Sequence, residues 1–202
     1  SKVIKVNFNL FKKYKKKIKN PYFSTLGNQE NLSFIFAVAH KLLLNKAKFI
    51  KTINNFKGLK YRQEIIHKSK NLTIINDSKA TSFSSSVNIL RTLKNVFWIV
   101  GGIPKQGDKF LLSKKNSIHI SAYLFGKNKK YFLNQLKKKI NIQTFKNLKN
   151  AINKVIKDIK LENNNYHKTI LFSPSAASFD TFKNFEDRGK KFNSIIKKLN
   201  DI

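Results

Sequence analysis

The stretch LTIINDSKAT, residues 72–81, decides how the second part of this chain folds. Its first four residues are apolar or β-branched, as in a strand buried on both faces, and six polar or small residues follow at once. Strands of this kind are typical of parallel sheets, which bind ligands beyond the carboxyl ends of their strands. We therefore predict a buried strand at residues 72–75 and a candidate ligand-binding segment at residues 76–81.

The alternation of strands and helices continues on both sides of this stretch. Residues 63–66 predict a strand that pairs with residues 72–75 across a polar turn. Further strands are predicted at 96–100, 118–125, 142–145 and 169–172. Helices are predicted at 83–94, from Gly126 to about 138, and at 148–159. Ser173-Pro174 is predicted to open the C-terminal helices. Such alternation indicates an α/β fold, a mostly parallel sheet with helices on both faces.

Before residue 60 the pattern is mainly helical. Apolar residues recur at helical spacing over residues 31–44, and a second helix over 47–56 ends at Gly58, which is suited to a helix C-cap. Residues 3–8 alternate as a strand does. The chain therefore divides into a helical segment, residues 1–60, and a complete α/β domain, residues 61–202.

The formal net charge of +32 comes from 42 basic and 10 acidic residues, but only Arg62, Arg91 and Arg188 are arginine. Arginine is favoured for contacts to phosphates and bases, so a surface shaped for nucleic acid would normally contain more of it. Lys, Asn, Ile and Phe all have A/T-rich codons, and their abundance favours composition bias as the origin of the charge. A basic nucleic-acid-binding module remains the alternative from another functional class; tight binding with a steep salt dependence would favour it.

Several functional classes are excluded by what the sequence lacks. Without cysteine there is no disulfide scaffold, thiolate zinc site or cysteine nucleophile. No apolar run approaches the roughly 18 residues of a membrane helix, and no secretory signal opens the chain, so a cytoplasmic location is expected. The four histidines have no ligand spacing, and no hydrolase motif is present, so no metal site is expected in this chain.

Four predicted strand ends carry polar or glycine-rich segments, and one of them, Gly126-Lys127-Asn128, is interpreted as a plain turn. The other three are residues 76–81, VGGIPKQGD at 100–108 and LFSPSAASFD at 171–180. The second has a lysine but lacks the spacing of a Walker A loop. Ammonium, hydroxyl and backbone N–H groups at such strand ends could hold an anion. The alternative for each segment is a plain helix cap or tight turn, and the spacing alone leaves both interpretations open.

Together these segments resemble the C-terminal domain of the D-glutamate-adding Mur ligases of peptidoglycan synthesis. The resemblance rests on NDSKAT at 76–81, on Gly101-Gly102 followed by Lys105, and on SPSAASFDTFKNFEDRG at 173–189, in that order. It extends from about residue 21 to residue 200.

Two upstream segments resemble other parts of the same family. GLKYR, residues 58–62, resembles the hinge between the central and C-terminal domains. NQEN, residues 28–31, precedes the first predicted helix and resembles the late central-domain segment that approaches adenine; Gly27 stands where the family usually has a histidine. The resemblance implies a Rossmann-like α/β domain at 61–202, preceded by a helical remnant of the central ATPase domain at 1–60.

The resemblance also implies a reaction, the ATP-dependent ligation of D-glutamate to UDP-N-acetylmuramoyl-L-alanine through an acyl phosphate. Catalysis would consist largely of positioning and charge neutralisation. D-Glutamate would be held by Thr81, Lys105, Ser178, Phe179 and Phe185. ATP would be contacted by Asn28, Asn31, Arg62, Asp77 and Lys79.

Much of such an enzyme has no counterpart here. The UDP-binding domain, the phosphate loop and the Mg²⁺ ligands of the family lie outside this sequence, so the chain resembles a fragment that we expect to be inactive alone. The complete enzyme is expected to be a monomer, without specific nucleic-acid binding or membrane insertion. A folylpolyglutamate-synthase-like ligase is the related alternative, and the FKNFE block at 182–186 makes it less favoured.

Overall fold

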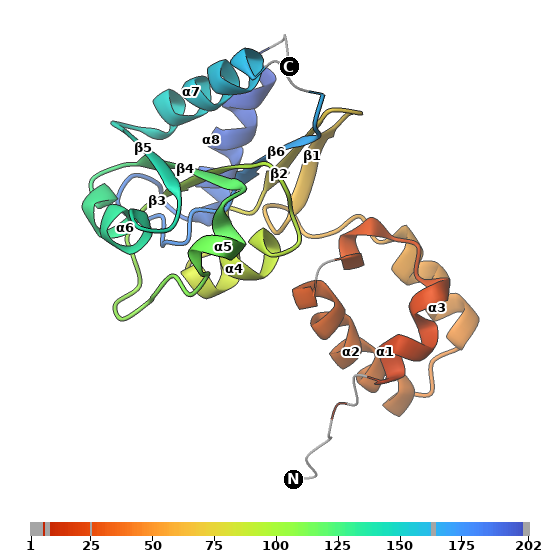
Figure 1. Ribbon diagram of the computed structural model, residues 1–202. Helices are drawn as coiled ribbons and strands as arrows, with labels where there is room; N and C mark the ends of the chain where they lie inside the picture. Colours follow the sequence, from red (N-terminus) through yellow and green to blue (C-terminus); the bar gives the residue numbers. More distant parts are fainter. Residues whose placement is uncertain (1–5, 7–8, 25, 163–164, 200–202) are drawn as a thin grey trace. The chain divides into compact units, whose positions relative to one another are not determined.

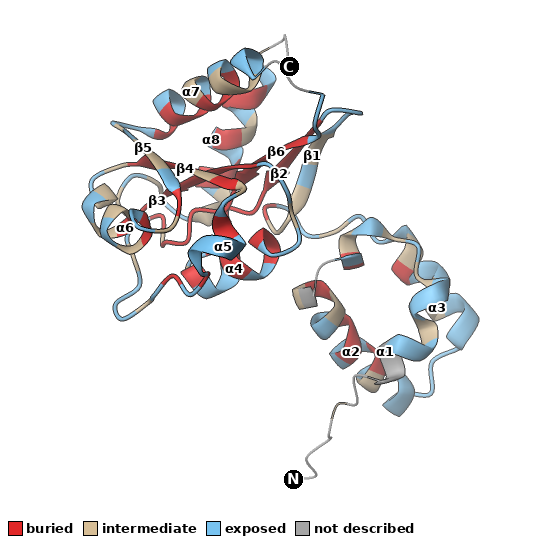
Figure 2. Cartoon of the chain, in the orientation of Figure 1, coloured by how far each residue is buried: buried red, intermediate tan, exposed pale blue. Residues whose placement is uncertain are grey.

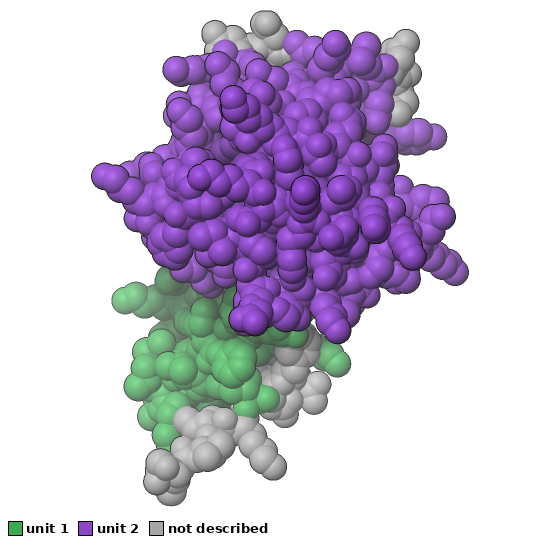
Figure 3. Space-filling view, turned by 90° about the vertical axis from the view of Figure 1, so that its left-hand side faces the viewer, with its two compact units in different colours: residues 1–58 green, residues 59–202 purple. Residues whose placement is uncertain are grey.

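The computed structural model describes residue 6 and residues 9–24, 26–162 and 165–199. The chain forms two compact units, residues 1–58 and residues 59–202, which are coloured separately in Figure 3. Each unit is described by itself. The strand predicted over residues 3–8 lies almost wholly outside the described residues.

The first unit is helical. Its elements are α1 (Asn9–Tyr14), two short 3₁₀ helices (Lys15–Lys17 and Pro21–Ser24), α2 (Leu26–Lys41) and α3 (Lys46–Asn55). A small core forms around Phe23, Leu32, Phe36 and Ile53. Helix α2 begins at Leu26, so residues 28–31 lie in its first turns and the prediction that they precede the helix was wrong.

The second unit is an α/β domain built on a six-stranded sheet (Figure 1). Its strands are β1 (Glu64–Lys68), β2 (Leu72–Asn76), β3 (Val96–Gly101), β4 (Ile120–Phe125), β5 (Asn141–Phe145) and β6 (Lys168–Phe172). Its helices are α4 (Phe83–Leu90), α5 (Lys114–Ser117), α6 (Lys129–Leu136), α7 (Leu148–Leu161) and α8 (Phe185–Lys197). The strand order is β1-β2-β6-β3-β4-β5, with β1 antiparallel to β2 and every other pair parallel.

Both faces of this sheet are buried, as the near-continuous apolar runs predict. Trp98 and Val100 of β3 pack on the side of α4 and α6, whereas Phe97 and Ile99 pack on the side of α7 and α8. Figure 2 shows the central strands in the colour of buried residues, with exposed residues on the outer faces of the helices. The predicted mostly parallel sheet with helices on both faces is confirmed.

The start of the C-terminal helix differs from the prediction. Residues 173–184 form a loop, and α8 begins only at Phe185, where the side chain of Asn184 accepts a hydrogen bond from Asp187 N at 2.8 Å. Ser173 and Pro174 resemble a helix start, but the backbone after them pairs with another loop: Ala177 N donates to Ile103 O at 2.9 Å. This tertiary pairing prevents a helix from starting there.

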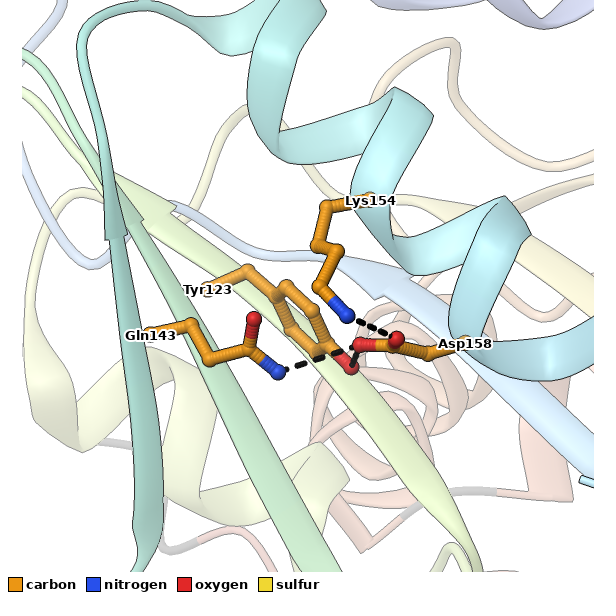
Figure 4. A network of polar contacts seen from close by, with 4 residues as sticks. All are labelled: Tyr123, Gln143, Lys154 and Asp158. Carbon is orange, nitrogen blue, oxygen red and sulfur yellow. Dashed lines mark hydrogen bonds and ion pairs between the residues drawn. The ribbon is translucent and has the colours of Figure 1, made fainter. Parts of the chain in front are cut away.

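A polar network fastens α7 to the sheet at the edge near β5 (Figure 4). The carboxylate of Asp158 on α7 accepts hydrogen bonds from Tyr123 Oη at 2.7 Å and Gln143 Nε2 at 3.1 Å, and it pairs with the Lys154 ammonium. Burial alone would raise the pKa of the Asp158 carboxyl, but these three partners outweigh burial and hold the pKa below its ordinary value. The network therefore stabilises the ionised form.

Replacing Tyr123 by phenylalanine is expected to lower the free energy of unfolding by about 1 to 2 kcal/mol at neutral pH, because a hydrogen bond to a carboxylate is lost. Since the native pKa of Asp158 lies below that of the unfolded chain, this loss should shrink as the pH falls through the native pKa. Urea unfolding at neutral and acidic pH measures both values. The matched control is Tyr166→Phe, because Tyr166 is 70% exposed and should tolerate the change. An equal loss in both variants would contradict the prediction.

Candidate functional site

The loops that follow β2, β6 and β3 meet at one edge of the sheet, because these three strands are neighbours and run parallel. Asp77 N donates to Phe172 O at 2.7 Å, which joins the ends of β2 and β6. Gly101 N donates to Pro174 O at 3.1 Å, which joins the ends of β3 and β6. In open α/β sheets this is the edge at which ligands bind, so these loops form the candidate site.

Arg188 of α8 lies buried beneath these loops with no exposed surface. Its Nε donates to Ser78 Oγ at 3.0 Å and its Nη2 to Ser78 O at 2.7 Å, both in the loop after β2. Its Nη1 donates to Ala176 O at 2.9 Å and makes a longer contact of 3.5 Å to Gly101 O. One guanidinium thus holds the loops after β2 and β6 and contacts the last residue of β3. Burial lowers the pKa of Arg188 to about 10, which leaves it charged at neutral pH.

Asp77 ends a chain of buried hydroxyl groups. Ser173 Oγ donates to Asp77 Oδ2 at 2.9 Å, Ser86 Oγ lies 2.7 Å from Ser173 Oγ, and Ser175 Oγ donates to Ser86 Oγ at 2.6 Å. Since the Ser173 hydrogen is directed at the carboxylate, Ser86 is the donor to Ser173, and the chain points toward Asp77. Burial raises the pKa of Asp77 to about 7, against the lowering effect of its hydrogen bonds and of Arg62 and Arg188.

Gly101 and Gly102 permit the close approach of these loops. Their φ angles are +157° and +131°, and Gly102 is in a region that side-chain-bearing residues rarely adopt. A Cβ atom on Gly102 would lie 2.3 Å from Ala177 O, and one on Gly101 would lie 2.3 Å from Phe125 O. Glycine is therefore required at both positions, because a side chain would collide with a carbonyl oxygen of a neighbouring segment. At Gly102 the φ angle requires it as well.

The residues predicted to hold D-glutamate come from these same loops and from the start of α8. Thr81 and Lys105 are exposed, Ser178 is 3% exposed, Phe179 is 71% exposed, and Phe185 is half-buried. The Lys105 and Ser178 loops are joined by the bridge between Ile103 and Ala177. The Lys105 loop is also tied to the start of α4, near Thr81, because Asp108 Oδ2 accepts a hydrogen bond from Phe83 N. In the described part of the chain, no hydrogen bond engages the Ser178 hydroxyl.

Three residues predicted to contact ATP lie in the second unit. Asp77 is buried at 4% exposure, Lys79 is exposed with its Nζ 3.9 Å from the centre of the Phe185 ring, and Arg62 is half-buried. The Lys79 contact brings a predicted ATP residue and a predicted D-glutamate residue together. Among the described residues, the Arg62 guanidinium makes no hydrogen bond or salt bridge, so it is available to an anion.

The backbone around Arg62 is strained and held by two carboxylates. Tyr61 and Gln63 have φ angles of +60° and +49°, which favour glycine. Glu64 Oε2 accepts from Tyr61 N at 3.0 Å, and Asp77 Oδ1 accepts from Gln63 N at 3.1 Å. The backbone on both sides of Arg62 is therefore anchored by hydrogen bonds.

The other two predicted ATP residues, Asn28 and Asn31, lie on α2 of the first unit. Asn28 is buried at 3% exposure and its Nδ2 donates to Tyr22 O at 2.6 Å, whereas Asn31 is exposed.

The sequence alone predicts no role for Arg188 or Asp180. Asp180 follows Phe179, and its Oδ2 atom is buried without a hydrogen-bond partner among the described residues. Burial raises the pKa of this carboxyl. One signal could have identified Arg188: in a chain whose basic residues are nearly all lysine, an arginine indicates a position that needs the guanidinium fork.

The described residues contain neither a metal-binding cluster nor a membrane-spanning helix. No group of three or more His, Cys, Asp or Glu side chains there is arranged to hold a metal ion. No helix there is both long enough and apolar enough to cross a membrane.

Curated relatives match most of the chain, although no protein-family model does. A UDP-N-acetylmuramoylalanine–D-glutamate ligase of Wolbachia sp. subsp. Brugia malayi is 37% identical over 176 residues, covering 87% of this chain and 35% of the relative. The ligase of the same name from Rickettsia prowazekii is 35% identical over 179 residues, covering 89% of this chain and 40% of the relative. The one from Prochlorococcus marinus is 36% identical over 193 residues, covering 90% and 40%.

Solved structures show the same fold. MurF from Acinetobacter baumannii has a TM-score of 0.61 at 16% identity, over 84% of this chain and 38% of that one. The UDP-N-acetylmuramate–alanine ligase MurC from Thermotoga maritima has a TM-score of 0.57 at 15% identity, over 87% and 39%. The fold of this chain is therefore that of the Mur ligases.

Within that class its sequence relatives are the UDP-N-acetylmuramoylalanine–D-glutamate ligases, so the resemblance stated from the strand-end segments is confirmed. The chain spans about two fifths of the length of these relatives.

Proposed function

We propose that this chain is the amino-acid-binding part of an ATP-dependent ligase that joins D-glutamate to UDP-N-acetylmuramoyl-L-alanine. The observation that carries the proposal is identity of 34–37% over most of the chain to ligases named for this reaction. The convergence of three loops with cationic, hydroxyl and backbone N–H groups supports it, because such groups suit a dicarboxylate.

D-Glutamate is bound in this proposal by Thr81, Lys105, Ser178, Phe179 and Phe185. The Lys105 ammonium and the hydroxyls of Thr81 and Ser178 pair with its carboxylates, while the amine stays unpaired and nucleophilic. Arg188 acts beneath them as a positioning residue, since its guanidinium holds the loops after β2 and β6 and contacts the last residue of β3. The chain thereby orients the amine for attack on an activated acyl group, and this positioning lowers the barrier.

ATP is the proposed source of activation, supplying the phosphoryl group for the acyl phosphate. Three residues of the second unit fit ATP: Arg62 is a half-buried cation near Asp77, Lys79 is an exposed cation, and the two oxygens of Asp77 keep lone pairs for ribose hydroxyls. Asn28 and Asn31 are proposed to approach the adenine. Each carboxylate oxygen of Asp77 already accepts one hydrogen bond, from Gln63 N or from Ser173 Oγ. Ribose hydroxyls would therefore use only the remaining lone pairs of these oxygens.

The domain assignment is also part of the proposal. Residues 1–60 correspond to the end of the central ATPase domain and residues 61–202 to the C-terminal domain. The Mg²⁺ ligands and phosphate loop belong to the remaining part of the ligase, so this chain alone is expected to complete no turnover. The complete enzyme is proposed to be cytoplasmic and monomeric.

The test is D-glutamate-dependent phosphate release by the complete ligase polypeptide that includes this chain, supplied with ATP, Mg²⁺ and UDP-N-acetylmuramoyl-L-alanine. Lys105→Ala and Ser178→Ala are each expected to lower kcat/KM for D-glutamate by about 10- to 100-fold, the loss of a charge-assisted hydrogen bond. Lys109→Ala is the matched control, because Lys109 is an exposed lysine of the same loop.

Each outcome has a distinct meaning. Full activity in both variants would show that the D-glutamate residues are wrongly assigned. No release from a folded parent enzyme would contradict the ligase proposal itself, and release by the 202-residue chain alone would contradict its assignment as an incomplete part.

A further inference from the structure

Three serine hydroxyls form a buried chain between α4 and the loop after β6. Ser86 and Ser173 have no exposed surface, and Ser175 is 1% exposed. Ser86 lies on the same face of α4 as the core residues Phe83 and Leu90, which come three residues before it and four after it. A buried hydroxyl at such a position costs free energy unless it is hydrogen-bonded. The hydrogen bonds of Ser86, rather than its volume, therefore account for a serine there.

On one side, the Ser86 hydroxyl orients Ser173 toward Asp77. Ser86 Oγ donates to Ser173 Oγ at 2.7 Å, which leaves the Ser173 hydrogen for Asp77 Oδ2 at 2.9 Å. Trp98 Nε1 donates to the carbonyl of the same serine at 2.7 Å. Hydrogen bonds in such a chain polarise and strengthen one another. The bond that orients the Asp77 carboxylate therefore depends on Ser86.

On the other side, Ser86 holds the turn that leads to Ser178. Ser175 has a φ angle of +56°, which is rare for a residue with a side chain and persists only where surrounding contacts fix it. Its hydroxyl donates to Ser86 Oγ at 2.6 Å and makes a longer contact of 3.5 Å to Ser173 O. Ser178 follows three residues later. A change in the turn at Ser175 would therefore move the Ser178 hydroxyl.

We propose that Ser86 is a positioning residue for both substrates, because its one hydroxyl orients Asp77 toward ATP and fixes the turn that carries Ser178 toward D-glutamate. Asp77 and Ser178 have these partners under the proposed function, on which the inference rests. Ser86 itself contacts neither substrate and acts through the two residues that do. Helix α4 thus connects the two halves of the site through a single buried oxygen.

The kinetic test is D-glutamate-dependent phosphate release by the complete ligase polypeptide with Ser86→Ala. We expect kcat/KM to fall about 3- to 10-fold for ATP and for D-glutamate, the effect of one weakened hydrogen bond at each site. Ser86→Cys keeps the volume but has only a weakly hydrogen-bonding thiol, so it should resemble Ser86→Ala. Ser117→Ala is the matched control and should keep the parent's constants. Ser117 is also fully buried, and it donates to the carbonyls of Ser113 and Lys139, which lie outside these loops.

A second measurement requires no activity. It is the pKa of Asp77 in the folded 202-residue chain, followed through the carbon-13 shift of the carboxyl group, which Asp77→Asn identifies. The charged groups that face this carboxyl are Arg62 and Arg188, and both lower its pKa. The hydrogen bonds from Ser173 and from Gln63 N lower it as well.

Ser86→Ala leaves both arginines in place and weakens only the hydrogen bond from Ser173. The pKa of Asp77 should therefore rise above its parent value of about 7. Ser117→Ala should leave this pKa unchanged. A general loss of stability would not move the pKa in the folded chain, so this measurement separates positioning from a merely structural role.

Several results would overturn the inference. Kinetic constants of Ser86→Ala equal to those of Ser117→Ala would do so, and so would an unchanged pKa of Asp77. A loss confined to one substrate would show that Ser86 serves one loop only, and parent-like constants in Ser86→Cys would show that volume matters rather than the hydroxyl. A parent enzyme without D-glutamate-dependent release would instead contradict the proposed function, while the pKa of Asp77 would still test the chain of hydroxyls.

Discussion

Replacing Arg188 by methionine is expected to lower the free energy of unfolding of the second unit by about 3 to 5 kcal/mol. Methionine fills much of the same space but donates no hydrogen bond. The carbonyls of Ser78 and Ala176 and the hydroxyl of Ser78 then lose buried partners at distances of 2.7–3.0 Å. Each buried acceptor left without a partner costs on the order of 1–3 kcal/mol.

The fluorescence of Trp98 measures this loss, because it is the one tryptophan of the chain and lies fully buried in the second unit. Arg91→Met is the matched control: Arg91 is exposed, so its change should stay within about 0.5 kcal/mol. Arg188→Lys keeps the positive charge but loses the guanidinium fork. Its loss in free energy of unfolding should therefore lie between those of Arg188→Met and Arg91→Met. If Arg188→Met and Arg91→Met were equally stable, the guanidinium would not hold the loops after β2 and β6 together.

Replacing Asp77 by asparagine is expected to remove a pH dependence of stability that spans up to about 4 kcal/mol between pH 4 and pH 7. The pKa of Asp77 is about 7 in the folded protein, against an ordinary value of 3.8. Between these values the folded state binds the proton that the unfolded state has released. The stability of the parent protein therefore falls through this contribution as the pH rises, and levels off above the native pKa.

Asparagine has no charge to bury and can still accept from Gln63 N. The measurement is urea unfolding of both proteins at a series of pH values from about 4 to 8, followed by Trp98 fluorescence. Groups that titrate elsewhere act equally in both proteins and cancel in the difference. A difference that is constant across the series would show that the Asp77 carboxyl keeps its ordinary pKa despite its burial.

Much of the α/β fold could be predicted because local and long-range preferences agree in its strands. The run VFWIVG at 96–101 is apolar throughout, which only a strand covered on both faces tolerates. The polar segments after 72–76 and 168–172 could be recognised as a candidate site for the same reason: they follow buried strands that a parallel sheet brings to one edge.

The parts that could not be predicted depend on contacts between distant residues. Ser173-Pro174 has the composition of a helix start, but Pro174 O accepts from Gly101 N and Ala177 pairs with Ile103, and the segment forms a loop. The role of Arg188 has no local pattern either, because its acceptors, backbone carbonyls and the Ser78 hydroxyl, lie more than ten residues away along the chain. The roles of the D-glutamate and ATP residues rest on the family resemblance and stay predictions.

The position of β6 has a consequence for the synthesis of this protein. The last strand to be made lies in the middle of the sheet, between β2 and β3. Before residues 168–172 leave the ribosome, the hairpin of β1 and β2 and the group of β3, β4 and β5 have no strand to join them, and β2 and β3 present unpaired edges. A truncation before residue 168 therefore removes the centre of the sheet, and a nascent chain must keep two separate sheet edges from aggregating until β6 is made.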